Sequence, residues 1–231
     1  MLEKPPLGLF IVGTDTGVGK TFVGCQLLEW LRSEGYRPGV YKPAESGFDD
    51  QNPEGSDAWR LWEAAGRPLS WKEVCPQRFS APLAPDQAAI KEGRVLNPRQ
   101  LRDGLSAWES YSPWVLVEGA GGILSPVSDE ELVLDLARDL GYPLVLVVDD
   151  SIGAINRALQ AVDVIRRYRG GMELVGLVLN QTSVAEDISR ATNGLQIQKR
   201  TGLPILANPR FGDQEVSFDG SVLKGFLPEA K

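Results

Sequence analysis

The chain of 231 residues contains no histidine. This absence excludes catalytic triads built on serine and histidine, cysteine–histidine pairs, and any metal centre held by imidazole. Proton transfer must therefore use carboxylates, lysines, water or the substrate itself. Phosphoryl transfer is compatible with this limit, because positioning and charge neutralisation dominate its catalysis.

Cysteine is nearly as scarce, with only Cys25 and Cys75, which lie far apart in the sequence. Because there is no Cys-x-x-Cys pair, the sequence predicts neither a zinc site nor a redox centre. Cys25 falls within a helical pattern, and we expect it to pack in the core.

Basic charge and long apolar runs are also lacking. The net charge is −7, and the only basic clusters, residues 166–169 and 199–200, are typical of the last turns of helices. The sequence therefore predicts no nucleic-acid partner. No segment approaches the ~18 apolar residues of a membrane span, and the amino terminus has no signal-peptide pattern. We expect a cytoplasmic protein without a membrane partner.

Short apolar runs alternate with helical periodicity along most of the chain. The predicted strands are Leu7–Val12, Gly39–Tyr41, Trp114–Val117, Leu144–Val148, Leu174–Leu179 and Ile205–Leu206. The predicted helices are Thr21–Ser33, Asp57–Ala65, Pro98–Ser110, Glu130–Leu140, Ile155–Tyr168 and Ala185–Thr201. This alternation predicts one three-layer α/β domain over residues 1–231, with a mostly parallel sheet and helices on both faces. Residues 68–98 are less regular, and we expect them to form a lid or an edge.

The segment from Gly8 to Phe22 has the layout of a phosphate-binding loop. An apolar strand enters a loop of small residues that ends in Gly19-Lys20-Thr21, and a helical pattern follows. Exposed backbone N–H groups and the positive end of a helix can surround a polyphosphate there. The strict motif requires glycine where Thr14 stands, and Gly13 lies one position earlier. A plain strand–turn–helix junction is the alternative, but the order of the elements favours a P-loop NTPase fold.

Polar residues follow several of the predicted strands, where parallel α/β sheets bind ligands. Lys42 follows the second strand, and Glu118 follows the strand that ends at Val117. Lys42 is either a solvated strand-end lysine or a source of positive charge for phosphoryl transfer. Glu118, placed before a run of small residues, is typical of the second anchor for Mg²⁺.

Three other polar positions leave alternatives open. Asp57 is either a helix cap or a ligand, and Asn180 either bonds an adenine edge or forms an Asx-turn. Asp149-Asp150, after the strand at residues 144–148, has no role that the pattern decides.

Together these segments resemble the dethiobiotin synthetases, the ATP-dependent enzymes of biotin synthesis. The matching segments are Gly13–Thr21, Tyr41–Gly47, Ser56–Asp57, Val117–Gly122, Gly153–Asn156 and Asn180. The resemblance implies a homodimeric P-loop ligase whose substrates are 7,8-diaminononanoate, CO₂ and MgATP. One substrate amine would take up CO₂ as a carbamate, which ATP phosphorylates. The other amine would then close the ureido ring and expel phosphate, forming dethiobiotin.

The resemblance also implies roles for individual residues. Those implied to bind the nucleotide are Gly17, Val18, Gly19, Lys20, Thr21, Phe22, Asp57, Glu118, Gly119, Ala120, Gly121, Asn180 and Pro209. Within this set, Thr21, Asp57 and Glu118 would hold Mg²⁺. Lys42 and Lys20 would be the catalytic residues. Ser46, Gly153 and Asn156 would contact the substrate, the last two receiving its carboxylate from the neighbouring subunit.

The chain departs from the family pattern in two places. The family often has histidine after Ser-Pro in the middle loop, whereas this chain reads Ala84-Pro85-Asp86. The adenine-side Pro-Trp segment appears only as Asn208-Pro209-Arg210-Phe211, which leaves base specificity and the role of Asp86 open.

Two other classes share the loop. Partitioning or septum-positioning ATPase switches of the MinD type usually carry an additional lysine at the start of the loop, where this chain has Gly13-Thr14. Amidase-like synthases of the cobyrinic acid group would normally need a further glutaminase domain.

Overall fold

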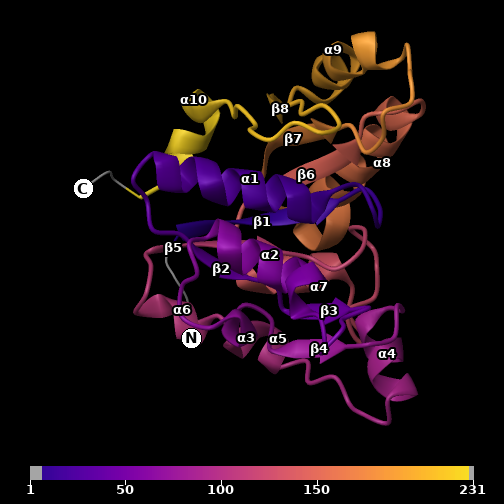
Figure 1. The fold of residues 1–231 in the computed structure, drawn as a ribbon. Coiled ribbons are helices and arrows are strands. Elements are labelled where there is room, and N and C mark those ends of the chain that lie inside the picture. The colour runs from indigo at the N-terminus through magenta and orange to yellow at the C-terminus, as the bar shows by residue number, and fades with distance from the viewer. Residues whose placement is uncertain (1–6, 229–231) are drawn as a thin grey trace.

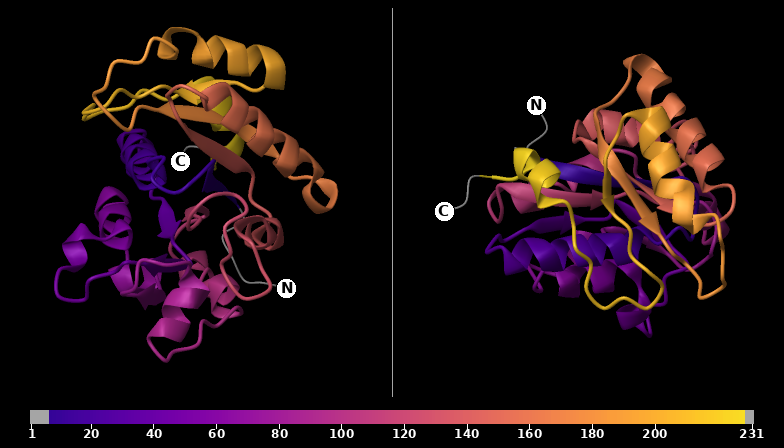
Figure 2. Two further views of the ribbon diagram at one scale, coloured as in Figure 1. Left: turned by 90° about the vertical axis from the view of Figure 1, so that its right-hand side faces the viewer. Right: turned by 90° about the horizontal axis from the view of Figure 1, so that it is seen from above.

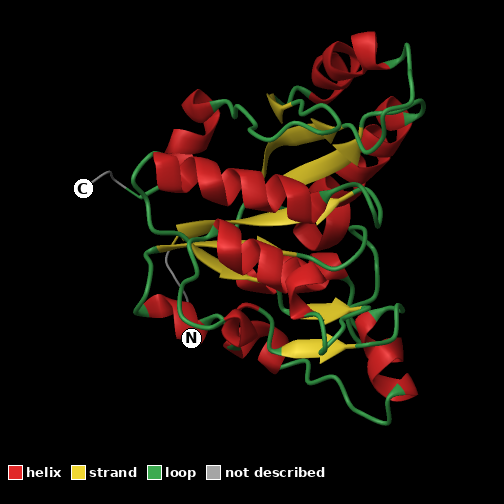
Figure 3. Ribbon diagram, in the orientation of Figure 1, coloured by secondary structure: helices red, strands yellow, loops and turns green. Residues whose placement is uncertain are grey.

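The centre of the molecule is a parallel sheet with the strand order β2-β5-β1-β6-β7-β8 (Figures 1 and 3). The computed structural model describes residues 7–228. Its six strands are β1 (Leu7–Gly13), β2 (Gly39–Tyr41), β5 (Trp114–Glu118), β6 (Leu144–Asp149), β7 (Leu174–Asn180) and β8 (Ile205–Ala207). Each predicted strand is present, with bounds within one residue of those expected. Residues 1–6, on which the expectation of no signal peptide rests, lie outside the described residues.

Helices cover both faces of this sheet, so the predicted three-layer α/β fold is confirmed (Figure 2). The long helices are α1 (Lys20–Ser33), α2 (Asp57–Ala64), α7 (Val133–Leu140), α8 (Ala154–Arg167) and α9 (Arg190–Thr201). Helices α1 and α2 lie on one face, and α7 and α8 lie on the other (Figures 1 and 2). Within residues 7–228, no helix combines the length and apolar character that a membrane crossing requires.

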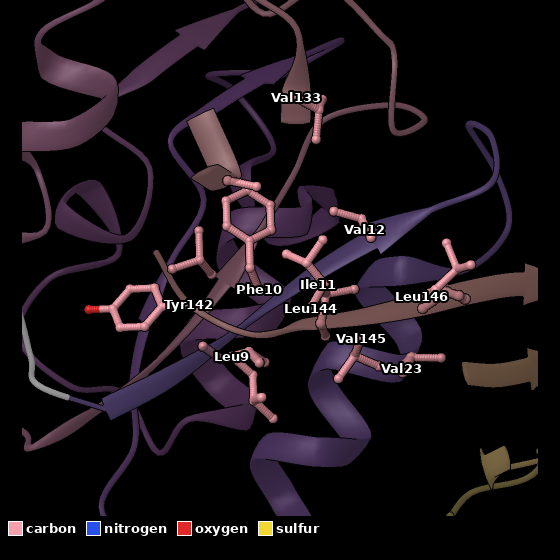
Figure 4. Packing of buried hydrophobic residues seen from close by; sticks show 14 of the residues in the cluster. Leu9, Phe10, Ile11, Val12, Val23, Val133, Tyr142, Leu144, Val145 and Leu146 are labelled. Atoms are coloured by element: carbon pink, nitrogen blue, oxygen red, sulfur yellow. The ribbon is translucent and has the colours of Figure 1, made fainter. Parts of the chain in front are cut away.

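The core is built around β1, whose residues from Leu9 to Val12 are fully buried. Side chains of a strand alternate between its two faces. Phe10 accordingly points toward Val133 at the start of α7, whereas Ile11 faces α1 (Figure 4). Burial on both faces explains why β1 reads as a continuous apolar run.

The helix predicted over Pro98–Ser110 is wrong. The segment forms two short helices, α5 (Gln100–Asp103) and α6 (Ser106–Glu109). The hydroxyl of Tyr41 donates to the carbonyl oxygens of Gln100 and Leu101, 2.8 and 3.2 Å away. The N–H of Leu105 then bonds to the carbonyl of Arg102, three residues back. The Gly104 N–H still bonds to the Gln100 carbonyl, so the regular i to i−4 ladder is interrupted at Leu101.

Two further helices begin later than predicted. Helix α7 begins at Val133 rather than Glu130, because the N–H groups of Val127 and Ser128 bond to the Glu131 carbonyl and form a turn. Helix α9 begins at Arg190 rather than Ala185, after a segment in which Asp187 accepts the N–H and hydroxyl of Ser189.

Residues 68–98 contribute one strand to a small second sheet that the sequence did not predict. Strand β3 (Ala44–Ser46) pairs in parallel with β4 (Gln77–Phe79). Helices α3 (Trp71–Val74) and α4 (Pro85–Lys91) flank β4. The segment is thus not an edge of the main sheet, and the expectation of a lid stays a prediction. The remaining described elements are α10 (Gly220–Leu223) and the 3₁₀ turns η1 (Pro53–Gly55), η2 (Tyr168–Gly170) and η3 (Lys224–Phe226).

Candidate active site

The loop between β1 and α1 has the backbone conformation of a phosphate-binding loop. Gly17 and Gly19 have φ values of 77° and 89°, which favour glycine over other residues. Among the described residues, no side chain caps the start of α1, so its first N–H groups are available to an anion. The N–H of Thr14 bonds to the carbonyl of Val147, 3.0 Å away. The extra residue of the motif therefore continues the β1–β6 ladder and leaves the loop intact.

Lys42 lies in a cluster of buried charges just beyond β2. Its ammonium is 2.5 Å from Glu118 Oε1 and 2.9 Å from Asp57 Oδ2. The Thr21 hydroxyl donates to the same Glu118 oxygen at 2.9 Å. Side chains from α1, α2 and the ends of β2 and β5 therefore converge on one point.

The ammonium and carboxylate groups of this cluster stabilise one another in their ionised forms. Burial lowers the pKa of Lys42, but the carboxylates of Glu118, Asp57 and Glu45 outweigh it and hold the pKa above its ordinary value. Burial also raises the pKa of Asp57, and there the Lys42 ammonium prevails and leaves the pKa below its ordinary value. Lys42 and Asp57 are both ionised at neutral pH.

Lys20 lines the same cavity, but burial and neighbouring charges shift its pKa in the opposite direction from that of Lys42. Burial is the largest effect and lowers its pKa below the ordinary value, while Glu118 offsets part of that shift. Its ammonium donates to the Asp15 carbonyl oxygen, 3.1 Å away.

A cavity of about 310 Å³ unites most of the predicted site. It is lined by Thr16, Gly17, Gly19, Lys20, Thr21, Phe22, Lys42, Glu45, Ser46, Asp57, Arg60, Glu118, Gly119, Ala120 and Gly121. A second cavity of about 410 Å³ shares Thr16, Ser46, Ala120 and Gly121 with it, and Pro82, Leu83 and Pro85 form its apolar wall.

Three lining residues, Thr16, Glu45 and Arg60, were not predicted. Arg60 lies one helical turn after Asp57, a spacing of three that places both on one face of α2. The sequence offers no comparable spacing that would identify Glu45 beside Lys42. The groups that Glu45 contacts are backbone groups of residues 57 and 58, which a side-chain pattern does not reveal.

The donor set fits a divalent cation such as Mg²⁺. Thr21, Asp57 and Glu118 supply one hydroxyl and two carboxylates. Among residues 7–228, the buried Oε2 of Glu118 has no hydrogen-bond partner. The same residues contain no group of three or more acidic or cysteine side chains that would hold a metal. Mg²⁺ commonly binds one or two carboxylates and completes its shell with substrate phosphates and water.

Asn180 lies on the far side of the loop from Lys42. Its amide donates to the carbonyl of Val18 at 2.9 Å, and it is almost fully buried. The carbonyl of Pro209 accepts the N–H of Gln181 at 3.1 Å, which brings the β8 end beside Asn180. Asn180, Val18 and Pro209 thus lie together beside the loop, and they do not line the 310 Å³ cavity.

Asp149 and Asp150 make contacts within the protein. Asp150 is 1% exposed and accepts the amides of Asn193 and Asn208 at 2.8 and 3.2 Å. Asp149 accepts the hydroxyls of Ser151 and Thr182. Both carboxylates therefore join the end of β6 to neighbouring segments.

Gly153 and Asn156 do not line the 310 Å³ cavity. They lie at the start of α8, where Gly153 has a φ of 88° and precedes the first helical residue. Asp86 also lies elsewhere, on a separate cavity of about 450 Å³ that includes Glu130 and Glu131.

Comparison with known proteins is consistent with this geometry. A family model described as an AAA domain matches residues 7–208. A protein named ATP-dependent dethiobiotin synthetase BioD from Rhodopirellula baltica is 39% identical over 87% of this chain and 83% of its own length. Proteins of the same name from Caulobacter vibrioides and Anaeromyxobacter dehalogenans are 39% and 40% identical. They cover 89% and 84% of this chain, and the matches span 93% and 85% of their own lengths.

Solved structures with the same fold are more distant. The signal recognition particle receptor FtsY from Elizabethkingia anophelis has a TM-score of 0.54 and 19% identity, covering 94% of this chain. The 54 kDa signal recognition particle protein from Aeropyrum pernix has a TM-score of 0.53 and 20% identity, covering 95%. The chain spans 63% and 45% of these two proteins, so the likeness concerns the fold alone.

Proposed function

The chain belongs to the ATP-dependent dethiobiotin synthetase family, and we propose that the cavity between the phosphate loop and Lys42 is where it closes the ureido ring. Formation of dethiobiotin at the expense of ATP is a ligase reaction of biotin biosynthesis. The observation that carries the proposal is the convergence of Lys20, Lys42, Asp57 and Glu118 on one cavity. A partitioning-type ATPase switch is not favoured, since the relatives at 39–40% identity are synthetases.

The proposed reaction has three steps. One amine of diaminononanoate attacks CO₂ and loses a proton to water, giving a carbamate. A carbamate oxygen attacks the γ-phosphorus of ATP, the bond to the bridging oxygen breaks, and ADP leaves. The second amine attacks the carbonyl carbon, its proton passes to water, and the bond to phosphate breaks. The substrate supplies both nucleophiles, so no histidine is needed.

Lys42 and Lys20 stabilise the negative charge that these steps build up. Both ammonium groups are buried on the cavity, where electrostatic stabilisation is stronger than in water. Lys42 acts on the carbamate and the transferred phosphoryl group, and Lys20 acts on the β- and γ-phosphates. The loop N–H groups from Gly17 to Phe22 hold the phosphates in place.

Mg²⁺ bound by Thr21, Asp57 and Glu118 would neutralise charge on the β- and γ-phosphates. The orphan Oε2 of Glu118 supports this assignment. Asn180 and Pro209 would contact adenine, with Asn180 joined to the loop through Val18.

The substrate chain would occupy the adjoining 410 Å³ cavity. Its apolar wall of Pro82, Leu83 and Pro85 suits methylene groups, and Ser46 lies at the junction of both cavities. Gly119, Ala120 and Gly121 allow the substrate to approach the backbone closely.

The proposal includes a cytoplasmic homodimer in which residues 1–231 act as one domain. The start of α8, with Gly153 and Asn156, would receive the substrate carboxylate of the neighbouring subunit, since a helix N-terminus suits an anion. Ile152 and Ile188 are 77% and 96% exposed there. The Ile152 N–H bonds to the carboxylate of Asp187, the residue before Ile188, so the two exposed side chains belong to neighbouring segments. Exposed apolar side chains that gather in this way suit an interface.

The decisive experiment is a ring-closure assay. Purified protein with diaminononanoate, bicarbonate and MgATP should form dethiobiotin and ADP in equal amounts, measured by mass spectrometry and chromatography. A reaction without the diamine is the control. ATP hydrolysis that does not need the diamine, with no ureido product, would contradict the proposal.

A further inference from the structure

Glu45 is a charged residue of the cavity to which the proposed reaction gives no role. It is 6% exposed, lies in the middle of β3, and comes three residues after Lys42. A buried carboxylate is costly unless it is paired or hydrogen-bonded, so its contacts should explain its presence.

Both oxygens of Glu45 bind the start of α2. Oε1 accepts the N–H of Asp57 at 2.8 Å, and Oε2 accepts the N–H of Ala58 at 3.0 Å. The next N–H, that of Trp59, is accepted by the hydroxyl of Ser56 at 3.1 Å. Two side chains thus satisfy the first three N–H groups of the helix, and the carboxylate also suits the positive end of its dipole.

These contacts close a ring. From Lys42 the backbone runs to Glu45, whose carboxylate holds the Asp57 N–H, and the Asp57 side chain returns to the Lys42 ammonium at 2.9 Å. Strand β3 is itself held by β4, in which Arg78 stands opposite Glu45. The ring therefore fixes where α2 begins relative to the loop that carries Lys42.

We propose that Glu45 is a positioning residue, which sets Asp57 at the distance from Lys42 that the metal and the transferred phosphoryl group require. This inference rests on the proposed function, in which Asp57 is a ligand of Mg²⁺. Ser56 caps the same helix turn but bonds only Trp59, whose side chain does not line the cavity.

The test compares Glu45→Gln with Ser56→Ala. Glutamine keeps the length of the side chain but can accept only one of the two N–H groups. Ser56→Ala removes a cap of the same helix and leaves both contacts of Glu45 in place. For each protein, calorimetry gives the affinity for ADP with Mg²⁺ and in EDTA, and thermal unfolding gives Tm. Steady-state rates give kcat and KM for ATP.

The tightening of ADP binding by Mg²⁺ should fall about tenfold in Glu45→Gln, as is typical when a residue supporting a metal ligand is changed. Affinity in EDTA should change less than about twofold, because the phosphate loop is untouched. Ser56→Ala should lower Tm and leave the Mg²⁺ effect as in the wild type. An unchanged Mg²⁺ effect in Glu45→Gln, or the same loss in Ser56→Ala, would overturn the inference.

Two further variants complete the test. Glu45→Asp keeps the charge on a shorter side chain, so it decides the matter if Glu45→Gln does not fold, and it should also weaken the Mg²⁺ effect. Asp57→Asn should lose that effect as well. If Asp57→Asn keeps it, the proposed metal site is wrong; if only the Glu45 variants keep it, the positioning role alone fails.

Discussion

At the scale of the residue, the centre of this protein is a lysine surrounded by carboxylates. Lys42 is almost fully buried, as is Glu118, and each would be costly without the other. Asp57 is more exposed, with 40% of its side chain accessible. The cluster therefore has a closed inner pair and an open outer carboxylate, which suits a site that must admit phosphate and metal.

Replacing Lys42 with alanine should remove most of the catalysis. We expect kcat to fall about 10²–10³-fold, the size of effect seen when one charge-stabilising donor is lost, with an unchanged far-UV circular dichroism spectrum. Ring-closure rates check this, and Lys72→Ala, which changes an exposed lysine, is the control. Turnover near the wild-type rate would remove Lys42 from the mechanism.

The ion pair of Asp57 should make stability depend on pH in the acid range. The pKa of Asp57 is lowered in the folded protein, so its contribution is present above the unfolded value of about 3.9 and is lost as pH falls through the folded value. The Tm difference between wild type and Asp57→Asn, measured without Mg²⁺, should be constant above about pH 5 and shrink below about pH 4. A difference that does not vary with pH would contradict the pairing.

The sequence could predict the site residues that stand at strand ends or in a motif. Lys42 and Glu118 stand at strand ends, Lys20 and Thr21 end the loop that follows β1, and a parallel sheet brings such positions to one rim. Glu45 could not be found in this way, because its partners are backbone groups twelve and thirteen residues away.

At the scale of the element, prediction succeeded where residues form an apolar run and failed where contacts with other elements decide. Strands β2 and β8 have three residues each and are largely apolar, whereas the equally short β3 and β4 contain Glu45 and Arg78 and show no apolar run. The segment at residues 100–109 has a helical pattern, yet the hydroxyl of Tyr41 binds the Leu101 carbonyl, and the Leu105 N–H that would bind it in a continuous helix bonds to Arg102 instead.

Close strand contact at Gly8 leads to a prediction for β1. A Cβ at Gly8 would lie 2.4 Å from the carbonyl oxygen of Val115 on β5, and backbone must move to accommodate it. Gly8→Ala should lower the free energy of unfolding by about 1–3 kcal/mol, as overpacking does.

Urea denaturation checks this prediction against a matched control. Gly55 has open space around its Cβ position and no positive φ, so Gly55→Ala should stay within about 0.5 kcal/mol of wild type. Equal urea midpoints for Gly8→Ala and Gly55→Ala would contradict the close contact between Gly8 and Val115.

At the scale of the whole molecule, the strand order explains why distant segments meet. β1 lies between β5 and β6, so the chain turns to one side of β1 for β2 and to the other for β7 and β8. Ligands bind at such a reversal point in open α/β sheets. The α/β class followed from the alternation of strands and helices, whereas the place of each strand in the sheet came from the structure.

The proposed homodimer gives a prediction at this scale. Sedimentation equilibrium should give a mass of twice 25.2 kDa for the wild type. Ile152→Asp should weaken the dimer and raise KM for the diamine, because a charge replaces a 77% exposed apolar side chain beside Gly153. Leu69→Asp, at another exposed apolar position, is the control. A monomeric wild type with full activity would refute the interface.

Strand β1 and its phosphate loop lie between two groups of proposed contact residues. Lys42, Ser46 and Glu118 come from the β2 and β5 side of the loop, while Asn180 and Pro209 come from the β7 and β8 side. Under the proposed function, the groups that would contact adenine and those that would act on the carbamate are therefore encoded in different stretches of the gene. Each set could then be varied with the other and the phosphate loop left unchanged, while Gly153 and Asn156 would remain a contribution of the neighbouring subunit.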